Sequence, residues 1–105
     1  MTYEVIFSRE AEEDLERLFD FALERELQSP TGDPSVPDRA IESIKDGCRF
    51  LARSPFICRK AGRSSFVREL IVPFGSDGYV AVFEVIDDRT VLIGAVRHQR
   101  EDDYY

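Results

Sequence analysis

Hydrophobic positions in the second half of the chain fall into short runs that are rich in β-branched and aromatic residues. Tyr79–Ile86 and Thr90–Val96 are almost continuously apolar and lack the alternation of a half-exposed strand. We therefore expect both strands to be covered on two faces. Asp87–Arg89 between them suits a tight hairpin, and Pro73 with Gly75–Gly78 indicates an earlier reversal. The pattern predicts an antiparallel meander.

The chain begins with a short run of β-propensity, Thr2–Phe7, that stops at Ser8. Ser8 is a good helix N-cap because its hydroxyl can accept a hydrogen bond from an unpaired backbone N–H. Acidic residues then crowd the first turns, where the helix dipole is positive. The apolar stripe of this helix contains Ala11, Leu15, Leu18 and Ala22, with Phe19 on its flank. We expect a strand that passes directly into an amphipathic helix.

A break rich in turn residues, Ser29–Pro37, ends the first helix, and a second helix is predicted to begin near Ser35 or Val36. Pro55 ends it, a basic loop follows, and the next strand begins near Phe66. The apolar face of the second helix contains Ala40, Ile41, Ile44, Gly47, Cys48 and Leu51. The glycine on that face would let a neighbouring element approach closely.

The order of these elements is strand, helix, helix, strand, strand, strand. Two helices with one apolar stripe each, and a sheet with apolar faces, favour an α+β fold. In this β-α-α-β-β-β arrangement a helical hairpin packs on a small, mainly antiparallel sheet. The pattern does not place the first strand, which can join an edge or the centre of the sheet. With 105 residues, residues 1–105 are expected to form a single domain.

Composition limits the functional classes. No run approaches eighteen apolar residues and the N-terminus lacks the pattern of a signal peptide, so we expect a cytoplasmic protein without a membrane span. Cys48 is expected in the core and Cys58 in a loop; with a single histidine they are too few for a zinc site, and no metal or cofactor is predicted. A net charge of −7 opposes attraction to nucleic acid, and no sequence-specific binding to it is expected.

Several segments, taken in order, resemble the ParE/RelE toxin superfamily over nearly the whole chain. They are the strand Tyr3–Phe7 before a capped acidic helix, Leu51–Pro55, Ala61–Arg63 before Val67–Leu70, Tyr79–Val85, and the closing Ala95–Arg100. The closing VRHQR and the Gly-Arg before the second strand are more similar to the ParE branch. The ordered combination carries the resemblance, since no single motif is as specific as a metal-ligand set.

The resemblance implies the toxin of a bacterial type II toxin–antitoxin system, of the kind linked to plasmid stabilisation. Its partner would be a ParD-like antitoxin that wraps the toxin with a helix and an extended segment. Phe21, Leu27 and Phe50 lie outside the predicted core stripes and are candidates for antitoxin binding. The alternative is that the stripes are wider than drawn and these residues are buried.

Two toxic activities divide this superfamily. RelE-like members cut messenger RNA on the ribosome and generally carry an arginine after the tyrosine of the third strand, where this chain has Val80. If the chain is a ribonuclease, the resemblance points to Arg68, His98 and Tyr104 as catalytic residues. ParE-like members are instead inhibitors of DNA gyrase without known catalysis. The valine and the acidic composition favour this second, non-enzymatic activity.

A gyrase inhibitor needs a surface for a large protein partner. The expected target-facing residues are the cations of the basic loop and of the closing segment with its histidine: Arg59, Lys60, Arg63, Arg97, His98 and Arg100. Alternatively, the histidine holds the C-terminal segment to the sheet, and the closing arginines pair with Glu101, Asp102 or the first helix. A third functional interpretation is an antitoxin-binding module that has lost its toxicity.

Overall fold

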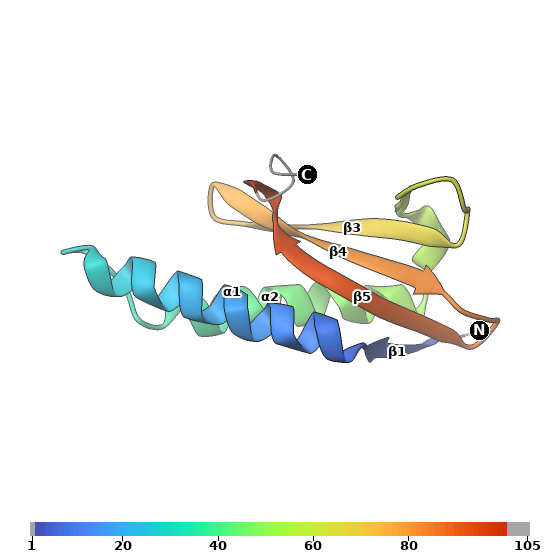
Figure 1. Ribbon diagram of the computed structural model, residues 1–105, viewed down its shortest axis with the longest axis horizontal. Helices are drawn as coiled ribbons and strands as arrows, with labels where there is room; N and C mark the ends of the chain where they lie inside the picture. The colour runs from blue at the N-terminus through green and yellow to red at the C-terminus, as the bar shows by residue number, and fades with distance from the viewer. Residues whose placement is uncertain (1, 101–105) are drawn as a thin grey trace.

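The protein is described here by a computed structural model covering residues 2–100. Five strands form one sheet in the order β1-β5-β4-β3-β2, and both helices lie on the same side of it (Figure 1). The elements are β1 (Glu4–Phe7), α1 (Arg9–Gln28), α2 (Val36–Arg49), β2 (Arg59–Lys60), β3 (Val67–Phe74), β4 (Asp77–Val85) and β5 (Thr90–His98). Short 3-10 helices at Phe50–Ala52 and Pro55–Ile57 follow α2, which therefore ends earlier than predicted.

The sheet confirms the α+β prediction and shows the position of the first strand, which the sequence pattern left open. β3, β4 and β5 form the predicted antiparallel meander. β1 lies at the edge beside β5 and runs parallel to it, with Val5 opposite Val91. A parallel neighbour requires a crossover, which here is the helical hairpin. The two-residue strand β2, at the other edge, was not predicted.

The β3–β4 hairpin is tighter than the sequence indicated. Phe74 pairs with Asp77, so the reversal occupies Gly75 and Ser76 alone, and Gly78 belongs to β4. Gly75 has a φ of 61°, a left-handed conformation that glycine adopts without steric cost. Pro73 lies within β3, beyond the short pairing with β2, where a missing N–H is tolerated.

The prediction that both central strands are covered on two faces holds only in part. The helices cover the face that contains Phe83, Val91 and Ile93, all buried. On the other face Val80 is 1% exposed, Val82 is half-buried and Glu84 is exposed. An apolar run shows that a strand avoids water but not how far along the strand each face is covered.

The helices approach the sheet as the glycine in α2 predicted. A Cβ placed on Gly47 would lie only 3.1 Å from Cγ2 of Val72 in β3. The adjacent Cys48 is 1% exposed, which confirms its place in the core, whereas Cys58 is half-buried against the same core. In residues 2–100 neither helix has the length and apolar character needed to cross a membrane.

Burial raises the pKa of the Cys48 thiol from 9.0 to about 12, and the stability that comes with the neutral thiol changes with pH. Because the folded pKa is the higher one, this stability is fully present below pH 9 and is lost as the pH rises toward 12. We expect iodoacetamide at pH 9 to label Cys48 only after denaturant is added, as followed by mass spectrometry. Labelling of Cys48 in the native protein at the unfolded rate would contradict its burial.

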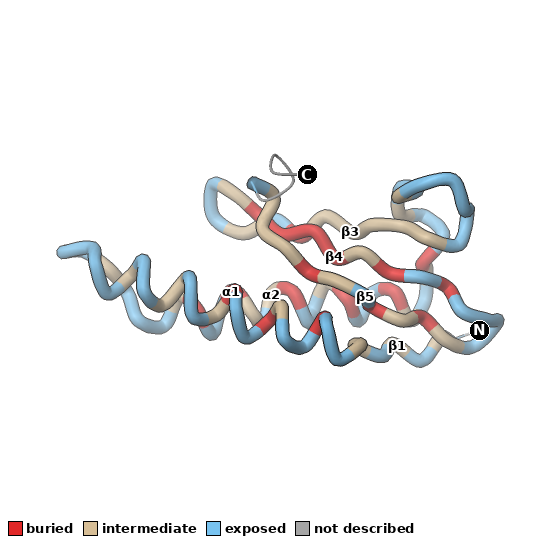
Figure 2. Tube along the Cα trace, viewed as in Figure 1, coloured by how far each residue is buried: buried red, intermediate tan, exposed pale blue. Residues whose placement is uncertain are grey.

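α1 extends beyond the sheet that supports its first half. Its buried residues, Ala11, Leu15 and Leu18, all lie before residue 19. The last turns project past the β3–β4 hairpin and contain only half-buried and exposed positions (Figures 1 and 2). The second half of the helix therefore contributes surface rather than core.

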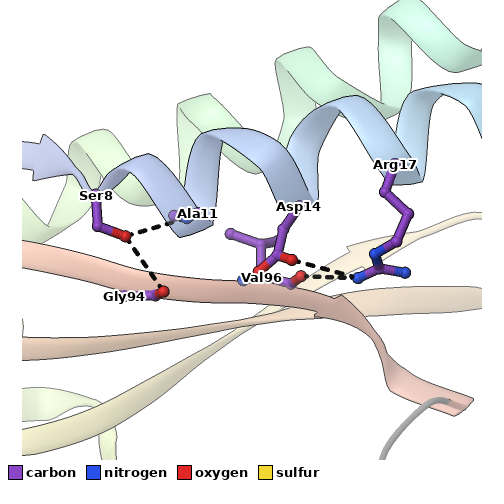
Figure 3. A network of polar contacts seen from close by, with 6 residues as sticks. All are labelled: Ser8, Ala11, Asp14, Arg17, Gly94 and Val96. Atoms are coloured by element: carbon purple, nitrogen blue, oxygen red, sulfur yellow. Dashed lines mark hydrogen bonds and ion pairs between the residues drawn. The ribbon is translucent and has the colours of Figure 1, made fainter.

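Ser8 joins β1, α1 and β5 at the sheet edge. Its side chain accepts the N–H of Ala11 at 3.0 Å, which confirms the predicted N-cap. Its hydroxyl also donates to the carbonyl of Gly94 at 3.3 Å (Figure 3). Its backbone N–H donates to the carbonyl of Ile93 at 2.9 Å. The helix thus begins at the point where β1 stops pairing with β5.

Beyond Ser8, side chains of α1 take the place of a neighbouring strand. The backbone N–H of Val96 donates to Oδ2 of Asp14 at 2.9 Å, and Nη2 of Arg17 donates to the carbonyl of Val96 at 3.5 Å (Figure 3). Arg17 and Asp14 are also an ion pair, at 3.7 Å. Backbone groups at an open edge invite pairing with other chains, and the helix satisfies them here.

Asp14→Ala is expected to lower the free energy of unfolding by about 1–3 kcal/mol, because it leaves the Val96 N–H without its acceptor. Asp20→Ala, which removes an exposed carboxylate from the same helix, is the control and should change stability by less than about 0.5 kcal/mol. Urea unfolding of the two variants measures the difference. Equal losses would show that the edge contact contributes nothing specific.

Candidate functional site

His98 is the last residue of β5, and its side chain packs against Tyr79 of the neighbouring strand β4. Its ring meets the ring of Tyr79 edge-on at 5.5 Å between centroids, and only 15% of the side chain is exposed. Nδ1 accepts the backbone N–H of Arg100 at 3.1 Å, and Nε2 lies 3.8 Å from Oδ2 of Asp77. Nε of Arg100 donates to Oδ1 of the same aspartate at 3.1 Å. This geometry suits a histidine that holds the closing segment to the sheet.

Arg97 lies on the other face of the sheet from His98, since neighbouring residues of a strand point to opposite faces. In the β4–β5 ladder Arg97 stands directly opposite Val80, and His98 opposite Tyr79. A cation is therefore present beside the position at which RelE-like members carry their arginine. The histidine is not on the same face as that cation.

Arg68 is engaged in holding the loop that precedes β3. Its guanidinium donates to the carbonyls of Ser65, Phe56 and Cys58 at 2.8, 2.9 and 2.7 Å. It also lies 5.1 Å from the ring centre of Phe56, a cation–π contact. Through these contacts Arg68 holds the preceding loop against β3, which is a structural role.

The two ribonuclease candidates that the structure describes, Arg68 and His98, are not brought together. Arg68 is opposite Phe83 in β4, while His98 is opposite Tyr79, four positions along the same strand. Four positions correspond to about 13 Å, beyond the reach of two groups that act on one phosphate. Tyr104 lies outside the described residues.

The predicted target-facing cations fall at two separate places on the sheet. Arg59 and Lys60 form β2 and pair with Glu69 and Arg68, and Arg59 also makes an ion pair with Glu69. Arg63 is exposed in the following loop. Measured along β3 from Glu69, Arg97 and His98 stand two and three positions away, about 7 and 10 Å, and Asp77, the partner of Arg100, stands five positions away, about 17 Å. A single target contact would have to span this length, and the target-binding role of the six residues stays a prediction.

Phe21, Leu27 and Phe50 lie outside the core, as expected, with 61, 69 and 45% of each residue exposed. They do not form one surface. Leu27 is in the last turn of α1, whereas Phe50 follows α2 at the end where α1 begins. These ends are roughly 25 Å apart along the helix axis. Their role in antitoxin binding stays a prediction.

A hollow of about 420 Å³ lies between the helices and the β3–β4 hairpin. Phe21 lines it together with Phe74 and Tyr79 of the two hairpin strands and His98 of β5. Of the three antitoxin candidates Phe21 is therefore the one that borders a concave surface here. Within residues 2–100 no group of three or more His, Cys, Asp or Glu side chains is placed to hold a metal ion.

A larger groove, of about 650 Å³, lies along α1 and α2 and has no lining residue from β3, β4 or β5. Its apolar part is formed by Phe7, Leu15, Phe19 and Ile41. One wall contains three carboxylates of α1 and the opposite wall an ammonium group of α2: Glu12, Glu16, Asp20 and Lys45. We name this surface the helical groove.

The three carboxylates of the helical groove are spaced four residues apart, so they stand one turn above another on α1. An apolar floor with an acidic wall fits an amphipathic helix with a basic flank. The sequence pattern missed this surface because Phe19 and Ile41 were assigned to the core stripes or their flank. Residues at the edge of an apolar stripe can border both the core and a surface groove. The regular spacing of the acidic residues was the sequence feature from which the helical groove could have been predicted.

The class of fold is the one seen in a solved toxin–antitoxin complex. The chain superposes on a chain from the chromosomal ParDE TA system of P. aeruginosa with a TM-score of 0.71, over 92% of this chain and 96% of that one, at 16% identity. It is also 40% identical over 68 residues to Toxin RelE3 of Caulobacter vibrioides, which covers 65% of this chain and 71% of the relative.

The family follows from the sequence match. The model of the ParE toxin of type II toxin-antitoxin system, parDE, matches residues 5–103. The chain belongs to this ParE toxin family. The resemblance seen in the ordered segments is thereby confirmed.

Proposed function

We propose that this ParE-type toxin inhibits DNA gyrase without catalysis of its own and is neutralised by a ParD-like antitoxin. The observation that carries the first part is the separation of the ribonuclease candidates. Arg68 is held by three carbonyl groups, and His98 lies about 13 Å away along the strands. A surface that binds a protein target needs no such assembly of catalytic groups.

Charge supports the same proposal. The chain has a net charge of −7, whereas binding to ribosomal RNA is driven mainly by contacts between cations and phosphates. The closing cations are also partly neutralised, since Arg100 pairs with Asp77. Gyrase is a protein target that can be recognised through mixed polar and apolar contacts.

The antitoxin part of the proposal rests on the helical groove. An amphipathic helix of the antitoxin would place apolar side chains on Phe19 and Ile41 and basic side chains along Glu12, Glu16 and Asp20. Leu27, which falls between Glu16 and Asp20 on the helical wheel of α1, would extend this contact, whereas Phe21 borders the hollow at the β3–β4 hairpin and would need a second contact there. Such an antitoxin is expected to be encoded by a small gene immediately upstream, with a ribbon–helix–helix domain.

A ribosome-dependent endoribonuclease is the second candidate, because Arg97 stands beside Val80 and supplies a cation on that face of the sheet. The third candidate, an antitoxin-binding module without toxicity, needs only the helical groove.

The test is induced expression of the chain alone in bacteria, with pulse labelling of DNA and protein synthesis in the same culture. We expect DNA synthesis to stop first, with filamentation and continued translation. The purified chain should then inhibit supercoiling by gyrase in vitro, and Arg97→Ala, which removes one of the expected target-facing cations, should weaken this inhibition. An early stop of translation that Arg97→Ala or His98→Ala removes would establish the ribonuclease instead, and growth without any defect would establish the inactive module.

A further inference from the structure

A third hollow lies at the opposite end of the molecule from the β3–β4 hairpin. It measures about 510 Å³ and is bordered by the start of the chain, the turn at Pro55–Ile57, the loop before β3 and the β4–β5 hairpin. We name it the hairpin-end pocket. The N-terminus and the β4–β5 hairpin meet at this end in Figure 1. The pocket shares no lining residue with the helical groove.

Large apolar side chains are exposed at this pocket. Phe56, Phe66 and Ile86 are 43, 52 and 49% exposed, and none of them belongs to the buried core cluster. The rings of Phe56 and Phe66 meet edge-on, with 6.2 Å between centroids. Exposed apolar residues that gather at one concave place mark a binding surface more often than single ones do.

The aromatic residues are held in position before any partner binds. Arg68 lies against the Phe56 ring and donates to the carbonyls of Phe56 and Cys58. The Phe66 N–H donates to the hydroxyl of Ser64 at 3.1 Å, and the Phe66 carbonyl accepts the N–H of Val85 at 2.8 Å. A surface ordered in advance loses less entropy on binding than a mobile one.

The charged residues that line the pocket are all acidic: Glu84, Asp87 and Asp88. Asp87 is engaged in the hairpin, where its Oδ1 accepts the N–H of Arg89 at 2.8 Å. The side chains of Glu84 and Asp88 are exposed and make no hydrogen bond or ion pair with the rest of residues 2–100. The cation nearest the aromatic floor, Arg68, is already bonded to carbonyl groups. Two carboxylates thus remain available to a ligand.

We propose that the hairpin-end pocket binds an extended segment of a partner protein in which an apolar or aromatic side chain is flanked by lysine or arginine. The anchor would insert between Phe66 and Ile86, and the flanking cations would meet Glu84 and Asp88. Phosphate-rich partners are excluded, because the carboxylates repel them. This surface is separate from the one that the proposed antitoxin helix would occupy, and the inference stands without it.

The test uses the purified ¹⁵N-labelled chain and three synthetic peptides, Ac-GKKWKKG-NH₂, Ac-GEEWEEG-NH₂ and Ac-GKKAKKG-NH₂. We expect the first to cause saturable amide shifts at Phe66, Ile86 and Asp88, and the other two to bind at least about fivefold more weakly, because each lacks either the charge or the anchor. Equal binding of the acidic peptide, or shifts confined to the helical groove, would overturn the proposal.

Two matched variants complete the test. Glu84→Gln/Asp88→Asn should weaken binding of Ac-GKKWKKG-NH₂ about fivefold or more, since it removes the two available carboxylates. Glu10→Gln/Glu13→Gln changes the net charge equally but lies on α1, outside the lining of the pocket, and should leave the affinity unchanged. An equal loss in both variants would show attraction to the overall charge rather than a site.

Discussion

Phe83→Ala is expected to lower the free energy of unfolding by about 3–5 kcal/mol, whereas Phe21→Ala should change it by less than about 1 kcal/mol. Phe83 is 1% exposed in β4, opposite Ile93 and beneath the helices. Its removal leaves a cavity in close-packed surroundings that relax only in part. Phe21 is 61% exposed on the projecting part of α1, so its ring gives up little burial.

Urea unfolding followed by circular dichroism measures both variants, and the slope of the transition shows whether the unfolded states are comparable. A loss at Phe21 as large as that at Phe83 would mean that the second half of α1 packs into the core in solution. The same side chain is deleted at both positions, so the difference reports mainly burial; alanine also favours the helix at Phe21 and disfavours the strand at Phe83, an effect of about 1 kcal/mol that is smaller than the expected difference.

Charge reversal in the helical groove should weaken antitoxin binding by at least about 100-fold. In Glu12→Lys/Glu16→Lys/Asp20→Lys the wall that attracts basic side chains would repel them at each of three turns. Losses of about 1 kcal/mol for each close charge pair add up to this factor, and like charges brought together increase it.

The control, Glu4→Lys/Glu13→Lys/Glu42→Lys, makes the same change in net charge at residues that do not line the groove and should bind within about threefold of the wild type. Calorimetric titration with the antitoxin encoded beside the gene gives both affinities. An unaffected triple variant would place the antitoxin elsewhere, with the exposed Phe21, Leu27 and Phe50 as the next residues to test.

Local chemistry predicted much of the fold. The hydroxyl of Ser8 caps α1, Gly47 admits Val72 of the sheet, and β3, β4 and β5 form the expected meander. Each of these features depends on residues close in sequence or on a single steric requirement.

The features that the sequence pattern left open or missed depend on contacts between distant segments. The edge position of β1 is decided by its pairing with Thr90–Ile93, some 86 residues later in the chain. The contact between Asp14 and Val96 is not indicated by the helical pattern around Asp14 or by the strand pattern around Val96. The exposure of Phe21, Leu27 and Phe50 followed from helical periodicity, which reports the face of a helix. Their separation did not, because the antiparallel pairing of two helices decides which positions become neighbours in space.

The two halves of α1 are expected to differ in how readily they unfold locally. Its first turns are joined to β5 through Ser8 and Asp14, so their amide hydrogens should exchange with deuterium only when the sheet itself unfolds. Beyond Leu18 the helix has no buried residue, and its amides should exchange through small local openings, orders of magnitude sooner. One continuous helix thus contains a cooperative half and a fraying half, and a partner that binds the fraying half would slow its exchange without any change in the fold.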